Sequence, residues 1–280
     1  MATYYVDNSV GGPGAGTIGN PWDDLESNFN ATGAPGDTFY IVGDALSPRD
    51  YNEGEVTLNT NGTAANRITI APAPGTLVCW KRGAVDDTFD VQGDYITIQG
   101  FELDCEAQSR NAITIDGDYV SIESCTIHDG SYDQLVRIRG DYATITGCTI
   151  YQNDDGLKDA VGVLLDGSAG TIISYNTIYD CKGDCIHLWN NLPNDAVTIE
   201  YNELYTTLGK CSETGIDIKD VGPNQSIIRY NILHGFRACD GSCGDTGQLA
   251  GPAIYIHMVA ENILIEFNII YDSTTGIEFN

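Results

Sequence analysis

A short pattern that recurs seven times constrains the fold of this chain more than any other feature of its sequence. In each copy an Ile is followed three positions later by Asn, Cys or Phe, and five positions later by Leu or Ile. The copies occupy residues 98–103, 122–127, 145–150, 173–178, 199–204, 228–233 and 265–270. Their spacing ranges from 23 to 37 residues. A period in this range predicts a fold built from stacked repeats.

A second strand pattern accompanies each copy, with apolar residues two positions apart. The pairs are Phe89/Val91, Ile113/Ile115, Val136/Ile138, Val163/Leu165, Ile186/Leu188, Ile216/Ile218, Ile254/Ile256 and Ile277/Phe279. This alternation is typical of strands with one face buried, and no helical period of 3.6 residues lies inside the unit. We therefore predict an all-β chain, a parallel β-helix solenoid of about eight coils.

Stacked coils place equivalent residues above one another. The position three residues after each Ile then forms one column. We expect it to be an asparagine ladder made by Asn176, Asn202, Asn231 and Asn268, with Cys125 and Cys148 as buried fillers earlier in the column. An outward column consists of His128, Tyr151, Tyr179, Tyr205, His234 and Tyr271. That column suits either aromatic stacking that stabilises a turn or a platform for sugar rings.

The two ends of the chain differ. Residues 1–66 lack the repeat and predict an N-terminal cap with a short helix near 21–29 and the first strands, whereas residues 67–280 form the β-helix. The last strand pattern, 276–280, is followed by no polar capping segment. We expect either that the natural chain continues beyond this point or that this end associates with another molecule, end to end.

Composition excludes some partners. The chain has 13 Lys+Arg against 40 Asp+Glu, a formal net charge of −27, which argues against nucleic acid as a partner. No apolar run is long enough for membrane insertion, and the first residues contain no secretory signal pattern. Nine cysteines are compatible with disulfides, free thiols or a zinc site among Cys181, Cys185, Cys211, Cys239 and Cys243.

The outward positions of the second strand predict one functional stripe. Between residues 137 and 257 they supply Arg137, Arg139, His187, Trp189, Asp217, Lys219, Tyr255 and His257. Three of the 13 Lys+Arg residues and two of the four histidines of the chain thus fall on this one stripe. We predict Arg137, His187, Trp189 and Tyr255 as residues that bind substrate. Abstraction of a proton from carbon needs a base, and carboxylates close to that base can hold a cation that stabilises the developing negative charge. Lys219 has Asp184, Glu213 and Asp217 nearby in this arrangement.

The sequence resembles the right-handed parallel β-helix superfamily that includes pectate lyases, chondroitinase B, alginate lyases and many phage tail and surface fibre proteins. The resemblance is carried by the repeat and by the entry segment 4–7, 19–22 and 36–38. Residues 213–219 are also similar to the strand of chondroitinase B and alginate lyases that leads from an acid to a lysine. By this resemblance Lys219 is the base and Glu213 a Ca²⁺ ligand. We accordingly predict Lys219, His257 and Arg139 as catalytic residues and Asp184, Glu213 and Asp217 as calcium ligands.

Two functions follow from this resemblance. The first is a polysaccharide lyase that uses Ca²⁺ on an acidic, uronate-containing polysaccharide. The second is a non-catalytic module that binds a glycan or forms part of a fibre. Whether the chain is an enzyme is left open by the sequence, since this fold carries both kinds of protein. For either function we expect an extracellular location or a place on a virion or cell surface.

Overall fold

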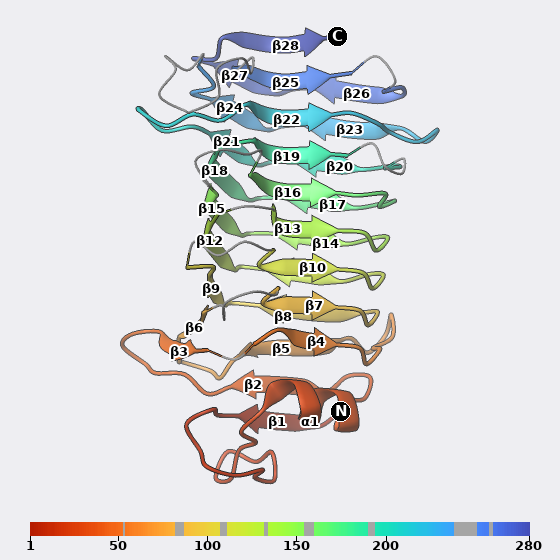
Figure 1. Cartoon of the computed structure of the whole chain (residues 1–280). Helices are drawn as coiled ribbons and strands as arrows, with labels where there is room; N and C mark the ends of the chain where they lie inside the picture. The colour runs from red at the N-terminus through yellow and green to blue at the C-terminus, as the bar shows by residue number, and fades with distance from the viewer. Residues whose placement is uncertain are drawn as a thin grey trace.

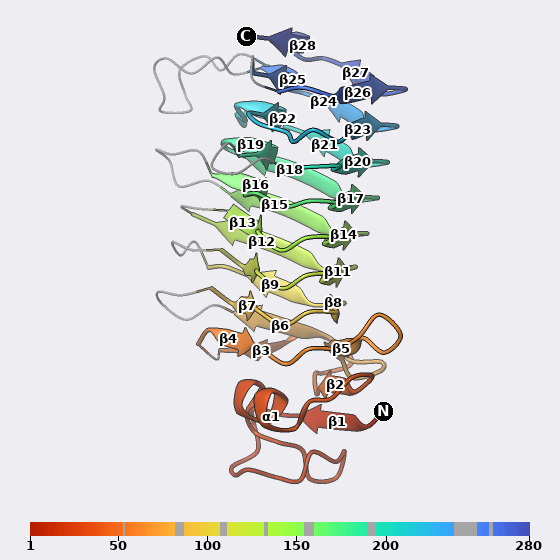
Figure 2. The ribbon, with the colours of Figure 1, turned by 90° about the vertical axis from the view of Figure 1, so that its right-hand side faces the viewer.

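The computed structural model describes residues 1–52, 54–81, 87–106, 111–131, 134–153, 160–189, 194–237, 251–257 and 260–280. In these segments the chain winds into coils that stack from the N-terminal to the C-terminal end of an elongated molecule (Figures 1 and 2). Three parallel sheets run along the stack. No helix in the described segments is long and apolar enough to cross a membrane.

Sheet I carries the outward stripe. Its nine strands in the described chain are β4 (Val56–Leu58), β7 (Phe89–Val91), β10 (Ile113–Ile115), β13 (Gln134–Ile138), β16 (Val161–Leu165), β19 (Asp184–Leu188), β22 (Thr214–Ile218), β25 (Pro252–Ile256) and β28 (Thr275–Phe279).

Sheet II has ten described strands. They are β1 (Thr3–Val6), β2 (Thr38–Ile41), β5 (Ile68–Pro72), β8 (Ile96–Gln99), β11 (Ser121–Glu123), β14 (Thr144–Thr146), β17 (Ile172–Ser174), β20 (Thr198–Glu200), β23 (Ser226–Arg229) and β26 (Ile263–Glu266).

Sheet III completes each coil. Its nine described strands are β3 (Arg49–Tyr51), β6 (Val78–Lys81), β9 (Glu102–Asp104), β12 (Thr126–Gly130), β15 (Thr149–Asn153), β18 (Thr177–Cys181), β21 (Glu203–Tyr205), β24 (Ile232–His234) and β27 (Ile269–Tyr271).

The predicted all-β parallel β-helix is confirmed, with about nine coils where the sequence indicated about eight. The additional coil comes from β3 and β4, which lie inside the segment assigned to the cap and pair with β6 and β7. Each of these two strands has three residues, and neither is followed by a copy of the Ile-to-Asn, Cys or Phe repeat by which the later coils were recognised.

The N-terminal end is covered by one helix, α1 (Leu25–Thr32), which lies beside the first coil (Figure 2). Asp24 caps it, because its carboxylate accepts a hydrogen bond from the backbone N–H of Ser27 at 2.6 Å. Leu25 and Phe29 are fully buried against the first coils. The helix thus shields the apolar interior at this end.

The predicted asparagine column forms a continuous hydrogen-bonded ladder. Asn202 uses all the hydrogen-bonding capacity of its side chain. Its Oδ1 accepts from the backbone N–H and from Nδ2 of Asn176, at 2.9 and 3.0 Å. Its Nδ2 donates to the carbonyl of Ile173 at 2.9 Å and to Oδ1 of Asn231 at 3.0 Å. Without these bonds, the polar groups at the turn between sheets II and III would be buried and would lack hydrogen-bond partners.

The outward aromatic column also stacks along its predicted length. Neighbouring ring centroids from His128 to Tyr271 lie 4.7 to 5.0 Å apart. Each ring covers the faces of its neighbours, so these faces are not available to sugar rings. The column therefore fits aromatic stacking that stabilises a turn better than it fits a platform for sugar rings.

Two further aromatic columns were not predicted. One contains Tyr95, Tyr119 and Tyr142, and the other contains Tyr175, Tyr201, Tyr230 and Phe267. All seven residues have positive φ, between 53° and 58°, a conformation that costs free energy for bulky side chains. Stacking between successive coils offsets that cost.

Removal of one rung should destabilise the whole stack. In Asn202→Ala the amide of Asn176, the carbonyl of Ile173 and Oδ1 of Asn231 lose buried partners. We expect the free energy of unfolding to fall by about 3 kcal/mol or more, because each unsatisfied buried group costs about 1 to 3 kcal/mol. Urea unfolding followed by circular dichroism measures this change.

The control is Asn59→Ala, which truncates an exposed side chain and should change stability by less than about 0.5 kcal/mol. Equal stability of the two variants would show that the ladder contributes nothing to the stack.

Candidate functional site

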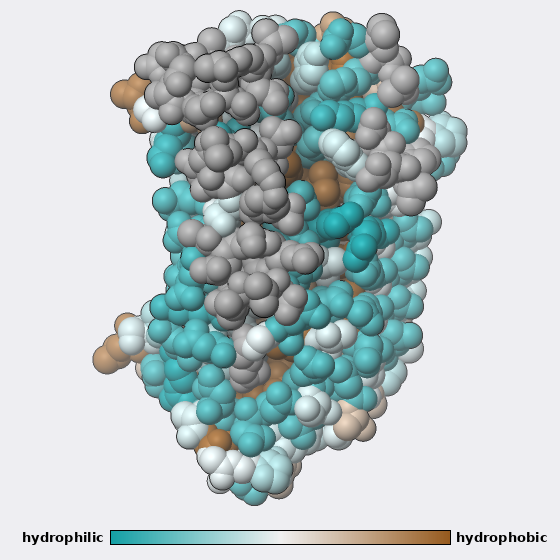
Figure 3. Space-filling view, viewed as in Figure 1, coloured by the Kyte–Doolittle hydropathy of each residue, from teal (hydrophilic) through white to brown (hydrophobic). Residues whose placement is uncertain are grey.

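The outward face of sheet I brings the predicted stripe together. His187 on β19 lies opposite Asp217 on β22, and Asp217 lies opposite Tyr255 on β25. The inward positions between them, such as Ile186, Ile216 and Ile254, are fully buried in the core. Strand alternation therefore forces these polar side chains outward, and the parallel register places them on adjacent coils. In Figure 3 this face is mostly hydrophilic, with small hydrophobic areas between the polar ones.

Asp217 is the centre of the site. Its side chain is only 7% exposed, although it lies on the outward face. Its Oδ1 is 3.0 Å from Nε2 of His257, and its Oδ2 is 3.4 Å from Nζ of Lys219. The two carboxylate oxygens thus contact two different groups that carry protons. This arrangement holds Lys219 and His257 on opposite sides of one carboxylate.

Trp189 packs beside Lys219 on this face. The ammonium nitrogen of Lys219 lies 4.9 Å from the ring centroid, which is a cation–π contact. The ring of His187 meets Trp189 edge to face, with centroids 5.1 Å apart. Tyr255 and His257 pack in a similar T-shaped contact at 4.5 Å. The aromatic rings therefore fix the positions of both histidines.

Asp184 and His187 form a buried pair at the start and near the end of β19. Asp184 Oδ2 is 2.9 Å from Nδ1 of His187, and both side chains are at most 5% exposed. Nε2 of His187 faces Asp217, 3.6 Å from its Oδ2. The sequence assigned His187 to substrate binding, but its burial gives a substrate little access to the ring.

The predicted arginines lie further along the stack. Arg137 forms an ion pair with Asp166, and Arg139 binds Asp116 with 2.6 Å between Nη2 and Oδ2. Three strand steps separate β13 from β22, so Arg139 is roughly 14 Å from Lys219 at ordinary strand spacing. The structure therefore does not bring Arg139 into the group around Asp217, and its catalytic role stays a prediction.

One residue of the site was missed by sequence reasoning. Asn280 donates a hydrogen bond from Nδ2 to the Tyr255 hydroxyl at 2.7 Å. It follows β28 and occupies the column above His257, because Ile256 lies opposite Phe279. Continuing the alternating count by one more coil would have found it.

The predicted calcium ligands are only partly gathered. Among the described residues, Asp184, His187 and Asp217 offer ligand atoms that all lie within 4.8 Å of one another. Glu213 is half-buried, and its backbone N–H donates to the carbonyl of Gly183 at 2.7 Å. Its role as a ligand stays a prediction. Calcium takes about six to eight oxygen ligands, so a group with two carboxylates and an imidazole does not fit it well.

The cysteines of the neighbouring loops take different states. Cys181 and Cys185 are free and buried. Cys211 is disulfide-bonded, and Cys239 and Cys243 lie outside the described residues. Burial raises the pKa of Cys185 well above its ordinary value, so its thiol is unreactive in the folded chain.

Comparison with solved structures identifies related folds. Pectate lyase Pel9A superposes with a TM-score of 0.68 at 17% identity, covering 100% of this chain and 74% of the other. A rhamnogalacturonan lyase gives a TM-score of 0.68 at 15% identity, with 97% and 87% covered. The protein ORF18 of Geobacillus virus E2 gives 0.57 at 11%, with 90% and 53% covered. At these identities the similarity establishes the right-handed parallel β-helix fold alone.

A search of curated protein sequences found no significant match. A family model described as "Right handed beta helix region" matches residues 85–247. Because the match spans more than half of the sequence, this chain belongs to the right-handed β-helix family.

Proposed function

We propose that this protein cleaves a uronate-containing polysaccharide by β-elimination on the outward face of β19, β22 and β25. The observation that carries the proposal is that Lys219 and His257 contact opposite oxygens of the buried carboxylate of Asp217. Elimination needs one group that accepts a proton and another that donates one. A single carboxylate that touches both groups can hold them in position and pass a proton between them.

The reaction assigns a role to each side chain. Lys219 is the base: its side-chain nitrogen, after its ammonium group has given up a proton to solvent, takes the proton on the carbon next to the uronate carboxylate. The electron pair of that C–H bond forms a carbon–carbon double bond, and the glycosidic C–O bond on the next carbon breaks. His257 gives a proton to the leaving oxygen. The products are a new reducing end and an unsaturated uronate.

Substrate binding would use the remaining stripe. The ring of Trp189 lies beside Lys219, where it can stack on a sugar ring. Arg137 and Arg139 would meet carboxylates further along the polymer, in exchange for their present contacts with Asp166 and Asp116. The calcium ion implied by the resemblance has no step in this proposal, because the clustered donors do not suit it.

An oxidising location agrees with this proposal. Cys211 is disulfide-bonded, and disulfides persist mainly outside the cytosol. We infer that the protein works outside the cell or on a virion or cell surface, where acidic polysaccharides occur.

The catalytic prediction concerns Lys219. With pectate, alginate or chondroitin as substrate, the wild-type protein should produce the ultraviolet absorbance of an unsaturated uronate. Lys219→Ala should lower the rate by about 10²- to 10⁴-fold, the usual contribution of a general base. Its circular dichroism spectrum should stay unchanged, since the lysine side chain is partly exposed.

Lys210→Ala is the matched control, because Lys210 is exposed and lines a different hollow, next to Asp129 and Asp180. Full turnover by Lys219→Ala would refute the assignment of the base. No absorbance change with any of the three polymers would refute the elimination reaction.

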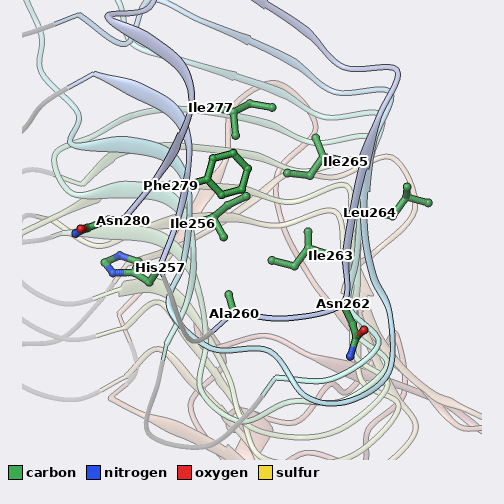
Figure 4. Close-up of a pocket in the computed structure, with 10 residues that line it drawn as sticks. All are labelled: Ile256, His257, Ala260, Asn262, Ile263, Leu264, Ile265, Ile277, Phe279 and Asn280. Carbon is green, nitrogen blue, oxygen red and sulfur yellow. The ribbon is translucent and has the colours of Figure 1, made fainter.

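A second candidate is a non-catalytic module that binds a glycan or stacks end to end in a fibre. It is favoured by the C-terminal coil, where a hollow of about 730 Å³ is lined mainly by apolar residues (Figure 4). Phe279, which lines this hollow, is 73% exposed, and Ile269 of β27, outside the hollow, is 58% exposed. The structural similarity to the viral protein ORF18 is compatible with this candidate.

End-to-end association has its own test. If the last coil is an interface, wild-type protein should form dimers or larger species in light scattering at micromolar concentration. Phe279→Asp should make it monomeric, because a buried carboxylate without a partner is costly. Leu208→Asp, at an exposed apolar residue outside this hollow, should leave association unchanged. A wild-type monomer at all concentrations would reject the interface.

A further inference from the structure

Tyr175 ends one of the aromatic columns in the middle of the stack, at the turn between β17 and β18 (Figure 1). Tyr201 covers one face of its ring, with centroids 4.9 Å apart and nearly parallel planes. Tyr175 is 63% exposed. Tyr201 and Tyr230, whose rings are covered on both faces, are only 43% and 40% exposed. The additional exposure of Tyr175 therefore belongs to the ring face that has no aromatic neighbour.

The position next to this open face carries no side chain. Gly147 on the preceding coil lies opposite Tyr175, directly after the paired strands β14 and β17. Its φ of 65° is close to the 58° of Tyr175, so the backbone makes the same turn. Apart from its chain neighbours, a Cβ at Gly147 would have only atoms of Ser124 within 4 Å, at 3.5 Å and beyond. A ring-shaped ligand in this space would stack on Tyr175 at about the strand spacing of 4.8 Å, as the tyrosines stack on one another.

The outward positions on both sides of this turn carry hydroxyl groups. Thr146 and Ser174 occupy the last outward positions of sheet II before the turn, and their hydroxyls lie 3.3 Å apart. Thr149 and Thr177 occupy the first outward positions of sheet III after it. Each hydroxyl can both donate and accept a hydrogen bond. A ligand with several hydroxyl groups of its own would therefore find partners on both sides of the ring.

Charge around the turn favours a neutral ligand. Glu123 and Glu200 occupy the same outward column of sheet II, one coil before and one coil after these hydroxyls. Glu123 accepts a hydrogen bond from the Ser121 hydroxyl at 2.8 Å. Glu200 forms an ion pair with Arg229 at 2.7 Å, so this cation already has an acidic partner. In a chain with a formal charge of −27, an acidic sugar would be repelled from this turn, whereas a neutral sugar would not.

A pyranose ring of a neutral polysaccharide has both of the required features. Its C–H groups can lie flat on the negative face of an aromatic ring, while its hydroxyls extend sideways to hydrogen-bond partners. We propose that the open face of Tyr175, next to Gly147, binds a neutral sugar ring of a polysaccharide. The site lies on the turn between sheets II and III and not on the outward stripe of sheet I. It therefore does not require the elimination reaction, and it would attach the protein to a neutral polymer.

The test is titration of the full chain with cellohexaose, mannohexaose and xylohexaose as separate neutral probes, followed by nuclear magnetic resonance. We expect at least one probe to bind with a Kd of about 1 mM or lower. Tyr175→Ala should weaken this binding by about tenfold, and Tyr175→Phe, which keeps the ring, by less than about threefold. Phe267→Ala is the matched control, because Phe267 ends the same column at its other end, is 67% exposed and lies between Glu266 and Asn268. It should bind the probe as the wild type does.

A wild-type crystal soaked in the bound probe gives an independent readout if Tyr175→Ala folds poorly, with sugar density expected on the Tyr175 ring beside Gly147. Hexagalacturonate, an acidic oligosaccharide, should not displace the neutral probe, because the two would occupy different faces of the molecule. The inference is overturned if none of the three probes binds, if a well-folded Tyr175→Ala binds as the wild type does, if hexagalacturonate displaces the probe, or if sugar density appears elsewhere only. Binding of a neutral sugar at Tyr175 without elimination would reject the proposed reaction and leave this site standing.

Discussion

The hydrogen bonds between successive coils are the interaction on which the rest of the structure depends. They hold each strand directly beside its equivalent in the next coil, so that like residues superpose along the stack. Asparagines then bond to asparagines and tyrosines stack on tyrosines, as the Asn176 to Asn268 ladder and the Tyr151 to Tyr205 column illustrate. The register thus converts a one-dimensional repeat into continuous columns of side chains.

The candidate site is a product of the same register. Asp184, His187, Asp217, Lys219 and His257 are spread over more than seventy residues of sequence, yet they lie on three adjacent strands or directly after them. A formal charge of −27 makes the rest of the molecule repel an acidic polymer. Any such substrate must therefore be held locally, by the few cationic groups of this stripe and by the ring of Trp189.

Counting along the repeat was sufficient to predict the strands from β7 onward, the asparagine ladder and the outward column of sheet I, because these depend only on the period and on alternation. It could not predict the burial of Asp184. This residue is the first of β19, and the connections that lead into the strands of sheet I differ in length from coil to coil, so the count does not fix the residues at this end of the strand. It also missed the ion pair between Arg137 and Asp166, which joins different columns on neighbouring coils. The tyrosines with positive φ were missed because tight turns at these positions usually contain glycine, as at Gly100 and Gly147.

The decisive measurement is a crystal structure of the protein soaked with a short uronate oligosaccharide. We expect sugar density across β19, β22 and β25, with a uronate carboxylate near Lys219 and with Asp217 between Lys219 and His257. Oligosaccharide bound to sheet II or sheet III, or coils in a register that separates Asp217 from His187 and His257, would contradict it.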